Sequence, residues 1–206
     1  MSKRDALHGE ILSRLIDVRY RFGERIQVKE LAGETKASRQ PIGAALQSLA
    51  ADGFVRIIPQ VGCEVIRPAA EDIEDFFGLY ALVEGRFAQL AAARRSAAQL
   101  REMAGLLHPF EDETRAASPA ALLRWAGAFH GSLRLMAGTE ATTACFDGLH
   151  SMASFLVMQC SGGAPDLDGL SSHLAKIRDA IEARDPAGAD RRTRDYIDYL
   201  ATRCVA

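Results

Sequence analysis

Residues 23–65 constrain the fold of this chain most strongly, because they predict two short helices and two strands in close succession. Ser38 has the side chain of a helix N-cap, and Pro41 lies in the first turn behind it, where a missing N–H is tolerated. Gly53 is suited to the C-terminal cap. The apolar residues in between recur at the spacing of an amphipathic helix: Ile42, Ala45, Leu46 and Leu49. One stripe of this helix is therefore buried.

A shorter amphipathic segment at 28–34 precedes this helix, with Leu31 and Ala32 on its inner face. Residues 35–37 leave room only for a turn, so the spacing is that of a helix-turn-helix. A further helix, which a three-helix domain of this kind needs to close its core, is predicted near the N-terminus. Its apolar face would hold Ala6, Leu7, Ile11, Leu12, Leu15 and Ile16.

A β-hairpin is predicted directly after Gly53. Residues 54–58 are rich in β-forming side chains, 59–62 read as a turn, and 63–66 return as a second strand. A hairpin immediately behind the second helix of a helix-turn-helix is a wing, so the segment predicts a winged helix that could lay its second helix into DNA.

Three separated pieces of this segment form a recognisable pattern: GERIQVKELA (23–32), SRQPIGAALQSLAADGFV (38–55) and PQVGCEV (59–65). In this order and spacing they resemble the N-terminal domain of the GntR family of bacterial transcriptional regulators, over roughly residues 7–67. By that resemblance Lys29 stands where the family usually has a DNA-contacting arginine. Arg39 matches the arginine of the family's Ser-Arg-x-Pro motif, and Gly62 matches the glycine at the tip of the wing.

The recognition helix departs from the family pattern at two positions. Gly43 stands where the family has an arginine, and it weakens the helix by roughly 1 kcal/mol relative to alanine. Gln47 replaces a residue that is often arginine. The residues expected to bind DNA are Lys29, Ser38, Arg39, Gln40, Gln47 and Gly62.

The 206 residues are enough for two domains, which we predict at 1–68 and 69–206. Residues 1–68 hold eleven Lys and Arg against eight Asp and Glu, a net charge of +3. The remaining residues carry a net charge of −5, which gives −2 for the whole chain. A basic winged helix suits contact with phosphates, although an imbalance of this size also arises by chance.

The four cysteines are scattered through the chain without a Cys-x-x-Cys pair: Cys63, Cys145, Cys160 and Cys204. This predicts free thiols in a reduced, cytoplasmic protein, acting as small buried apolar side chains rather than as redox or metal groups. The sequence has no apolar run long enough to span a membrane and no signal peptide at its N-terminus, so no membrane association is expected.

Helical periodicity replaces β patterning beyond Pro68. Ser96 and Ser118 are candidate N-caps, and Pro119 and Pro186 suit first helical turns. Six helices are predicted near 70–94, 97–116, 119–137, 140–161, 168–184 and 187–203. The expected fold is therefore mainly α, with a winged helix-turn-helix and its small hairpin followed by an all-helical bundle.

Weaker motifs in this second part are Leu82-Val83-Glu84, Phe129-His130-x-x-Leu133 and Ala180-Ile181-x-x-x-Asp185-x-x-x-Ala189. Their order resembles the effector-binding and dimerisation domain of the FadR branch of the GntR family, the FCD domain. Many FCD domains hold a divalent metal through an aspartate and three histidines. The matching positions here are Ala126, His130, Leu174 and Tyr196, and His173 is one residue out of register, a rotation of about 100° on a helix. We therefore predict no metal cofactor.

By the same resemblance, this chain has less positive charge at the expected effector site than the family usually has. Tyr80 stands where the family has an arginine four residues before Glu84, and residues 152–158 contain no arginine. Tyrosine and phenylalanine favour an aromatic or largely apolar effector, and Arg134, one turn beyond His130, is the remaining cation. The residues expected to bind effector are Tyr80, Glu84, His130, Arg134, Phe155 and Tyr196, with ordinary core packing as the alternative for each.

The leading hypothesis is a ligand-responsive transcriptional regulator, acting as a repressor, that binds a palindromic operator as a homodimer. A helical-bundle enzyme using Glu84, His130 and His173 is one alternative, but the sequence shows no nucleophile–base spacing or phosphate-binding loop. An interaction protein whose winged helix no longer binds DNA is the other, suggested by Gly43 and Gln47.

Overall fold

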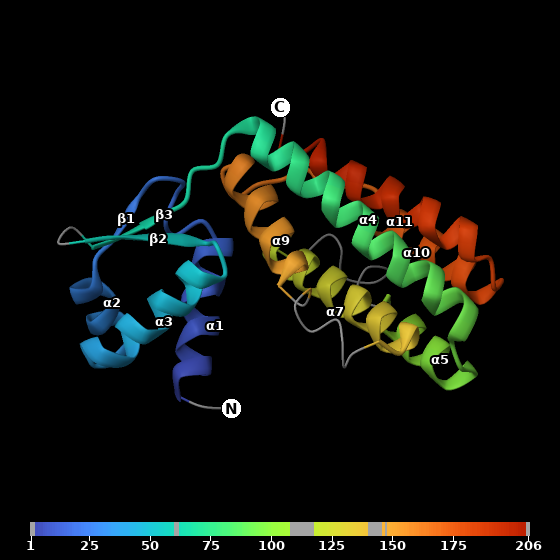
Figure 1. Cartoon of the computed structure of the whole chain (residues 1–206), viewed down its shortest axis with the longest axis horizontal. Coiled ribbons are helices and arrows are strands. Elements are labelled where there is room, and N and C mark those ends of the chain that lie inside the picture. The colour runs from blue at the N-terminus through green and yellow to red at the C-terminus, as the bar shows by residue number, and fades with distance from the viewer. Residues whose placement is uncertain (1–2, 60–61, 108–117, 140–145, 147, 205–206) are drawn as a thin grey trace. The chain divides into compact units, whose positions relative to one another are not determined.

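The computed structural model describes residues 3–59, 62–107, 118–139, 146 and 148–204. The chain forms two compact units, Met1–Ala69 and Ala70–Ala206 (Figure 1). The first contains three helices and a small antiparallel sheet, and the second contains only helices among its described residues. The predicted fold class is confirmed.

In the first unit, α1 (Lys3–Ile16), α2 (Val28–Thr35) and α3 (Arg39–Ala51) enclose a small apolar core. Its fully buried side chains include Ile11, Leu15, Leu31, Ile42 and Leu49. The stripe predicted for the second helix of the helix-turn-helix is therefore the buried one.

An ion pair connects α1 to α2, and the backbone conformation of the flanking residues marks the two ends of α3. Arg14 of α1 bonds Glu10 at 2.8 Å and also bonds Glu34 of α2. Ser38 is the N-cap residue of α3, with extended backbone angles, but its side chain makes no capping hydrogen bond. The helix ends before Gly53, whose φ of +85° suits glycine.

The predicted hairpin consists of β2 (Val55–Ile58) and β3 (Gly62–Val65). A strand that was not predicted, β1 (Arg25–Ile26), pairs with the other side of β3, so the strand order is β1-β3-β2. All pairs are antiparallel. A two-residue strand is too short to show an alternating pattern in the sequence, and it pairs only because β3 offers a free edge.

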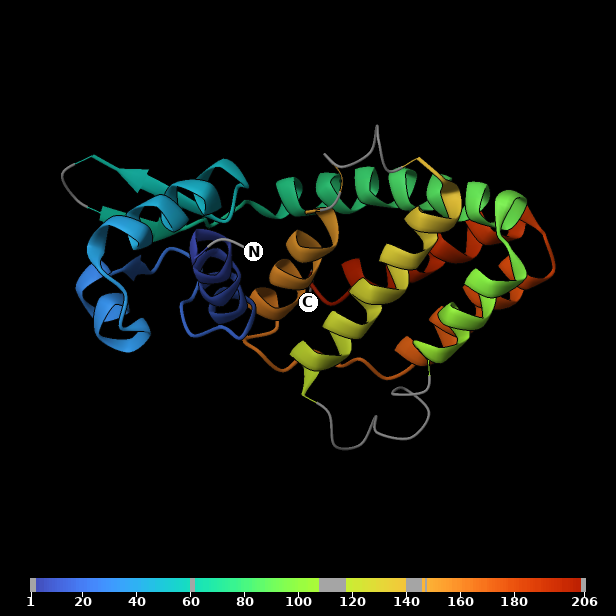
Figure 2. The same ribbon diagram turned by 90° about the horizontal axis from the view of Figure 1, so that it is seen from below.

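In the second unit the long helix α4 (Ala70–Arg94) packs along both α11 (Pro186–Ala201) and α7 (Pro119–Ala137). Figure 2 shows α4 alongside α11 over much of its length. Around this trio, α10 (Leu170–Glu182) packs on α11, α9 (Leu149–Cys160) on α7, and α5 (Ala97–Gly105) follows α4. α4 therefore touches most of the domain.

Helix starts follow the predicted caps. Ser96 and Gln99 form a reciprocal capping box, and the Ser118 hydroxyl accepts a hydrogen bond from the Ala121 amide. Pro119 and Pro186 occupy first-turn positions. Each of these starts was set by a local interaction that the sequence shows directly.

Two predicted helices are shorter than expected. The helix predicted at 97–116 ends at Gly105, with Leu106 and Leu107 in a turn, and 108–117 lie outside the described residues. The one predicted at 140–161 begins only at Leu149, behind the N-cap residue Gly148, and 140–145 are again outside the described part. Glycine has low helix propensity, so apolar periodicity across it overestimated both helices.

Candidate DNA interface and effector site

The predicted DNA-binding side chains are exposed on the helix-turn-helix. Lys29 lies in the first turn of α2, Arg39 at the start of α3, and Gln40 and Gln47 two turns apart on α3. Ser38 is exposed as well. Within the part of the chain that the structure describes, neither cation has an ion-pair partner, so both charges are free to meet phosphates.

A hollow of about 460 Å³ lies between α3 and the wing. Gly43 opens it, since a Cβ added there would meet nothing within 4 Å. Ile57 of the wing is 46% exposed beside it. The lining residues are Val28, Gly43, Leu46, Gln47, Ile57, Ile58, Pro59, Gly62 and Cys63. A side chain at position 43 could therefore begin without a clash at its Cβ.

A buried carboxylate joins α4 to α7 in the helical domain. Glu84 is fully buried, and its two oxygens accept hydrogen bonds from His130 Nδ1 at 2.8 Å and from Arg134 Nη1 at 2.7 Å. Burial alone would raise the pKa of Glu84, but the hydrogen bond and charge of His130, together with Arg134, hold that pKa below its ordinary value. Glu84 is therefore ionised at neutral pH.

A second polar pair lies beside this cluster. The Tyr80 hydroxyl is 3.0 Å from His150 Nδ1, and His150 Nε2 is 2.8 Å from the carbonyl oxygen of Leu123. A carbonyl can only accept, so Nε2 carries the proton and Nδ1 accepts from Tyr80. Burial, and then repulsion from His130, lowers the pKa of His150 to about 4. This histidine is neutral at pH 7, and the sequence analysis did not select it.

Two buried polar atoms on stacked rings have no hydrogen-bond partner among the residues that the structure describes. Tyr196 of α11 stacks on His130, with ring centroids 5.0 Å apart and an interplanar angle of 26°. The Tyr196 hydroxyl and His130 Nε2 are both buried and unpaired. Burial raises the pKa of Tyr196, so its hydroxyl stays protonated and can donate. Such an unsatisfied group costs roughly 1–3 kcal/mol, which a ligand or water of matching polarity would recover.

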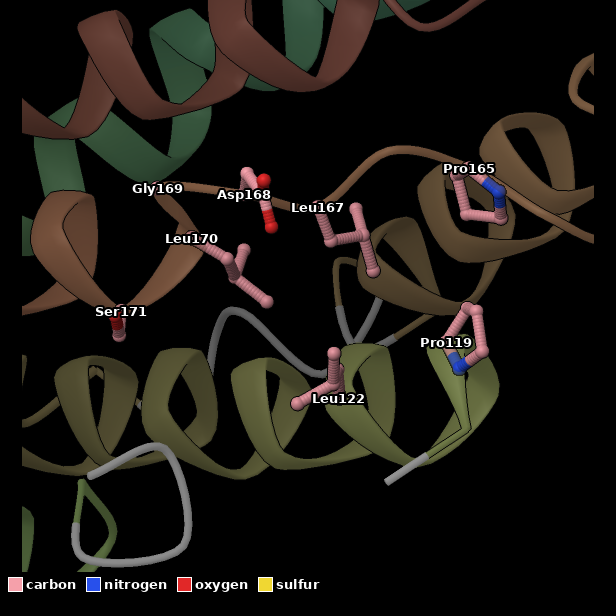
Figure 3. A pocket seen from close by; sticks show the side chains of 8 residues that line it. All are labelled: Pro119, Leu122, Pro165, Leu167, Asp168, Gly169, Leu170 and Ser171. Atoms are coloured by element: carbon pink, nitrogen blue, oxygen red, sulfur yellow. The ribbon is translucent and has the colours of Figure 1, made fainter. Parts of the chain in front are cut away.

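The structure brings five of the six predicted effector residues into one neighbourhood: Tyr80, Glu84, His130, Arg134 and Tyr196. The sixth, Phe155, is fully buried on α9, the helix that also carries His150. A separate hollow of about 290 Å³, which the sequence did not indicate, lies between the start of α7 and residues 165–171. Figure 3 shows the side chains that line it. Leucines and prolines line most of it.

The positions compared with the family's metal ligands are now placed. Ala126 and Leu174 are buried apolar residues, and the ring of His173 lies against Tyr199 with centroids 4.7 Å apart. Among the described residues, no group of three or more histidine, cysteine, aspartate or glutamate side chains is arranged to hold a metal ion. The enzyme alternative relied on Glu84, His130 and His173, of which only the first two are hydrogen-bonded to each other.

Two family models match the chain. The model "Bacterial regulatory proteins, gntR family" matches residues 3–65, and the "FCD domain" model matches residues 75–199. The chain belongs to the GntR family of transcriptional regulators, with an FCD effector-binding domain. This is a family of regulators rather than of enzymes.

Solved structures share the fold of this GntR-family chain. McbR/YncC of E. coli matches with a TM-score of 0.83 and 14% identity, over 97% of this chain and 95% of that one. A GntR transcriptional regulator from Rhodococcus sp. RHA1 matches with a TM-score of 0.77 and 18% identity, over 100% and 98%. The search among curated proteins returned no match. No helix in the described part of the chain has the length and apolar character needed to cross a membrane.

Gly127→Ala should destabilise the helical domain by about 1–3 kcal/mol, because a Cβ at that position of α7 would lie 2.7 Å from Cδ2 of His150. The ring cannot move away easily, since both of its nitrogens are hydrogen-bonded. Urea unfolding followed by fluorescence of Trp125, the one tryptophan of the chain, measures this domain. Gly131→Ala, one turn further along α7 with nothing within 4 Å, is the control and should be neutral or stabilising. Equal effects of the two substitutions would contradict the prediction.

His150 should make the domain less stable as the pH falls below neutral. Its pKa is about 4 in the folded protein and near 6.5 when unfolded, so the unfolded chain binds more protons between these values. The free energy of unfolding should therefore fall by roughly 2 kcal/mol from pH 7 to pH 5. His150→Gln should lose this dependence in Trp125-monitored urea titrations. His8→Gln, in the winged helix, should keep it; a pH dependence shared by both variants would point to other groups.

Proposed function

We propose that this regulator binds a palindromic operator as a homodimer in the cytoplasm and represses transcription until a small effector enters its helical domain. The observation that carries the effector part is the buried, unpaired pair of His130 Nε2 and the Tyr196 hydroxyl beside the Glu84 cluster. A gel shift with DNA upstream of the protein's own gene, repeated with candidate metabolites, tests the whole proposal. It also separates a regulator from an interaction protein that no longer binds DNA.

DNA contact is proposed for the exposed turn and helix that begin at Ser38. The Ser38 hydroxyl does not cap α3, so both it and the free amides of the first turn are available to a phosphate. Lys29 and Arg39 add positive charge on either side of the turn. Gln40 and Gln47 can form hydrogen bonds with base edges in the major groove. Gly62, which has no side chain, would let the wing approach the sugar-phosphate backbone of the DNA.

A homodimer follows from how little DNA one winged helix can read. A single module contacts few base pairs, whereas two modules related by a twofold axis read a palindrome. One face of α4 carries two exposed apolar side chains: Leu79 and Leu82, one helical turn apart, are 65% and 52% exposed. We propose that a second copy of the chain covers this face.

The effector is proposed to be aromatic or largely apolar, with a polar group for the unpaired atoms. Tyr80 is engaged with His150 and contributes no charge, while Arg134 is already bonded to Glu84. Little positive charge is left for a small dicarboxylate. Alanine and leucine at positions 126 and 174 cannot coordinate a metal, so we propose that the effector is sensed without a metal cofactor.

Arg39→Ala should weaken operator binding by about 1–3 kcal/mol, because it removes a contact to a phosphate or a guanine. The opposite substitution, Gly43→Arg, should tighten binding, since a Cβ at position 43 meets no neighbour and the substitution adds a positive charge to the recognition helix. Fluorescence anisotropy at one fixed salt concentration measures both. Arg191→Ala, an exposed arginine of α11, should bind as the wild type does. If Arg39→Ala also binds as the wild type does, the recognition helix has been assigned wrongly.

Replacing both Leu79 and Leu82 by glutamate should convert the dimer to a monomer, because buried unpaired charges would disrupt the interface. Sedimentation velocity of the full chain measures the change. Leu135→Glu is the matched control: Leu135 lies on α7 and is 57% exposed. A double variant that sediments like the wild type would show that this face of α4 is not the interface.

Tyr196→Phe should separate effector binding from stability. Without effector the variant should be as stable as the wild type or up to about 1 kcal/mol more stable, because it removes a buried hydroxyl that has no partner. Effectors that raise the melting temperature of the wild type should raise that of the variant less. Tyr199→Phe is the control, since that hydroxyl is bonded to the Asp168 carbonyl. Loss of stability in Tyr196→Phe would show that its hydroxyl is satisfied within the protein.

A further inference from the structure

The hollow between α3 and the wing is uncharged and mostly apolar. None of the nine residues that line it carries a charge, and Gln47 has the only side chain among them with strong hydrogen-bonding groups. Ile57 of β2 is 46% exposed there. It is the only exposed large apolar side chain among the described residues of the first unit. An exposed apolar surface of this kind often marks a binding site.

The hollow adjoins the face of α3 for which DNA contact is proposed. Arg39, Gly43 and Gln47 follow one another at intervals of four residues, so they lie on one face of the helix. Arg39 and Gln47 are both exposed, and the glycine between them has no side chain. Gly43 and Gln47 also line the hollow. A base contacted from this face of α3 would therefore lie beside the hollow.

Two exposed cations neighbour the lining residues. Lys29 follows the lining residue Val28 in α2, and Arg39 lies one turn before Gly43 in α3. Cations beside an uncharged apolar patch match a polyanion that also presents apolar groups. In the major groove of DNA, the apolar group is the C5-methyl group of thymine. The charge and the apolar character of this surface therefore favour the same partner.

We propose that the hollow recognises thymine in the operator, with the methyl group of the base in apolar contact with Ile57 beside Gly43. This specificity rests on the DNA binding proposed above. Gln47 complements it, because a glutamine amide can both donate a hydrogen bond to adenine and accept one from it. An A·T pair presents the adenine edge and the thymine methyl group side by side in the major groove. α3 and β2 would therefore select an A·T pair together.

Uracil separates the methyl contact from every other contact to the base. It lacks the methyl group of thymine but keeps all of its hydrogen-bonding groups, so replacing thymine by uracil changes only the apolar term. Burial of a group of this size corresponds to a change of about fourfold in Kd. Thymine recognition through the hollow predicts that loss at a specific position of the operator.

The test selects duplexes that bind the full chain from a random pool and then replaces each thymine of the consensus duplex by uracil in turn. Fluorescence anisotropy at one fixed salt concentration measures the Kd of each duplex. We expect uracil to weaken binding about fourfold at one thymine position of each half-site and to have little effect at the other thymines.

Ile57→Ala should bind the thymine and uracil duplexes equally, because it removes the apolar side chain from the hollow. Leu135→Ala is the matched control, since Leu135 is 57% exposed on α7 in the other unit, and it should keep the preference of the wild type. Circular dichroism checks that both variants are folded, and the uracil series on the wild type does not depend on either of them.

Two results would overturn thymine recognition while leaving operator binding in place. One is a wild type that binds every uracil duplex as tightly as the consensus duplex. The other is a folded Ile57→Ala variant that keeps the full preference for thymine. A selection that enriches no duplex would instead overturn the proposed DNA binding itself, and thymine recognition with it.

Discussion

The helical domain is organised around one buried negative charge. Glu84 lies in the middle of α4, and a carboxylate without partners at that depth would cost several kcal/mol. Both of its oxygens are bonded to side chains of α7, and one of these, His130, stacks on Tyr196 of α11. The charge therefore fixes the rotation of three helices at once, which apolar packing alone specifies less sharply.

Local signals in the sequence were sufficient for most of the fold. Ser118 with Pro119, and Pro186 behind Asp185, start their helices where the residue types demand, because the capping partner lies within the same turn. The winged helix was predictable for the same reason. Its turn, its helix cap at Gly53 and its apolar stripes each depend on neighbours in the chain rather than on distant residues.

Features that depend on distant residues were missed. The role of His150 rests on a carbonyl in α7, and the space for its ring exists because residue 127 has no side chain. A glycine inside a predicted helix is a usable signal of close approach, but it does not name the partner. Helical spacing did place Arg134 one turn beyond His130, although not the hydrogen bonds of either residue to Glu84.

The unpaired atoms of His130 and Tyr196 make this region locally frustrated in the sense of an energy landscape. A phenylalanine at position 196 would fill the same space without the unpaired hydroxyl, so selection for folding stability alone would favour it. A chain that keeps the hydroxyl holds its unliganded form slightly above the lowest energy that its backbone permits. A ligand that hydrogen-bonds to these two atoms would therefore gain the free energy that the unliganded protein lacks there.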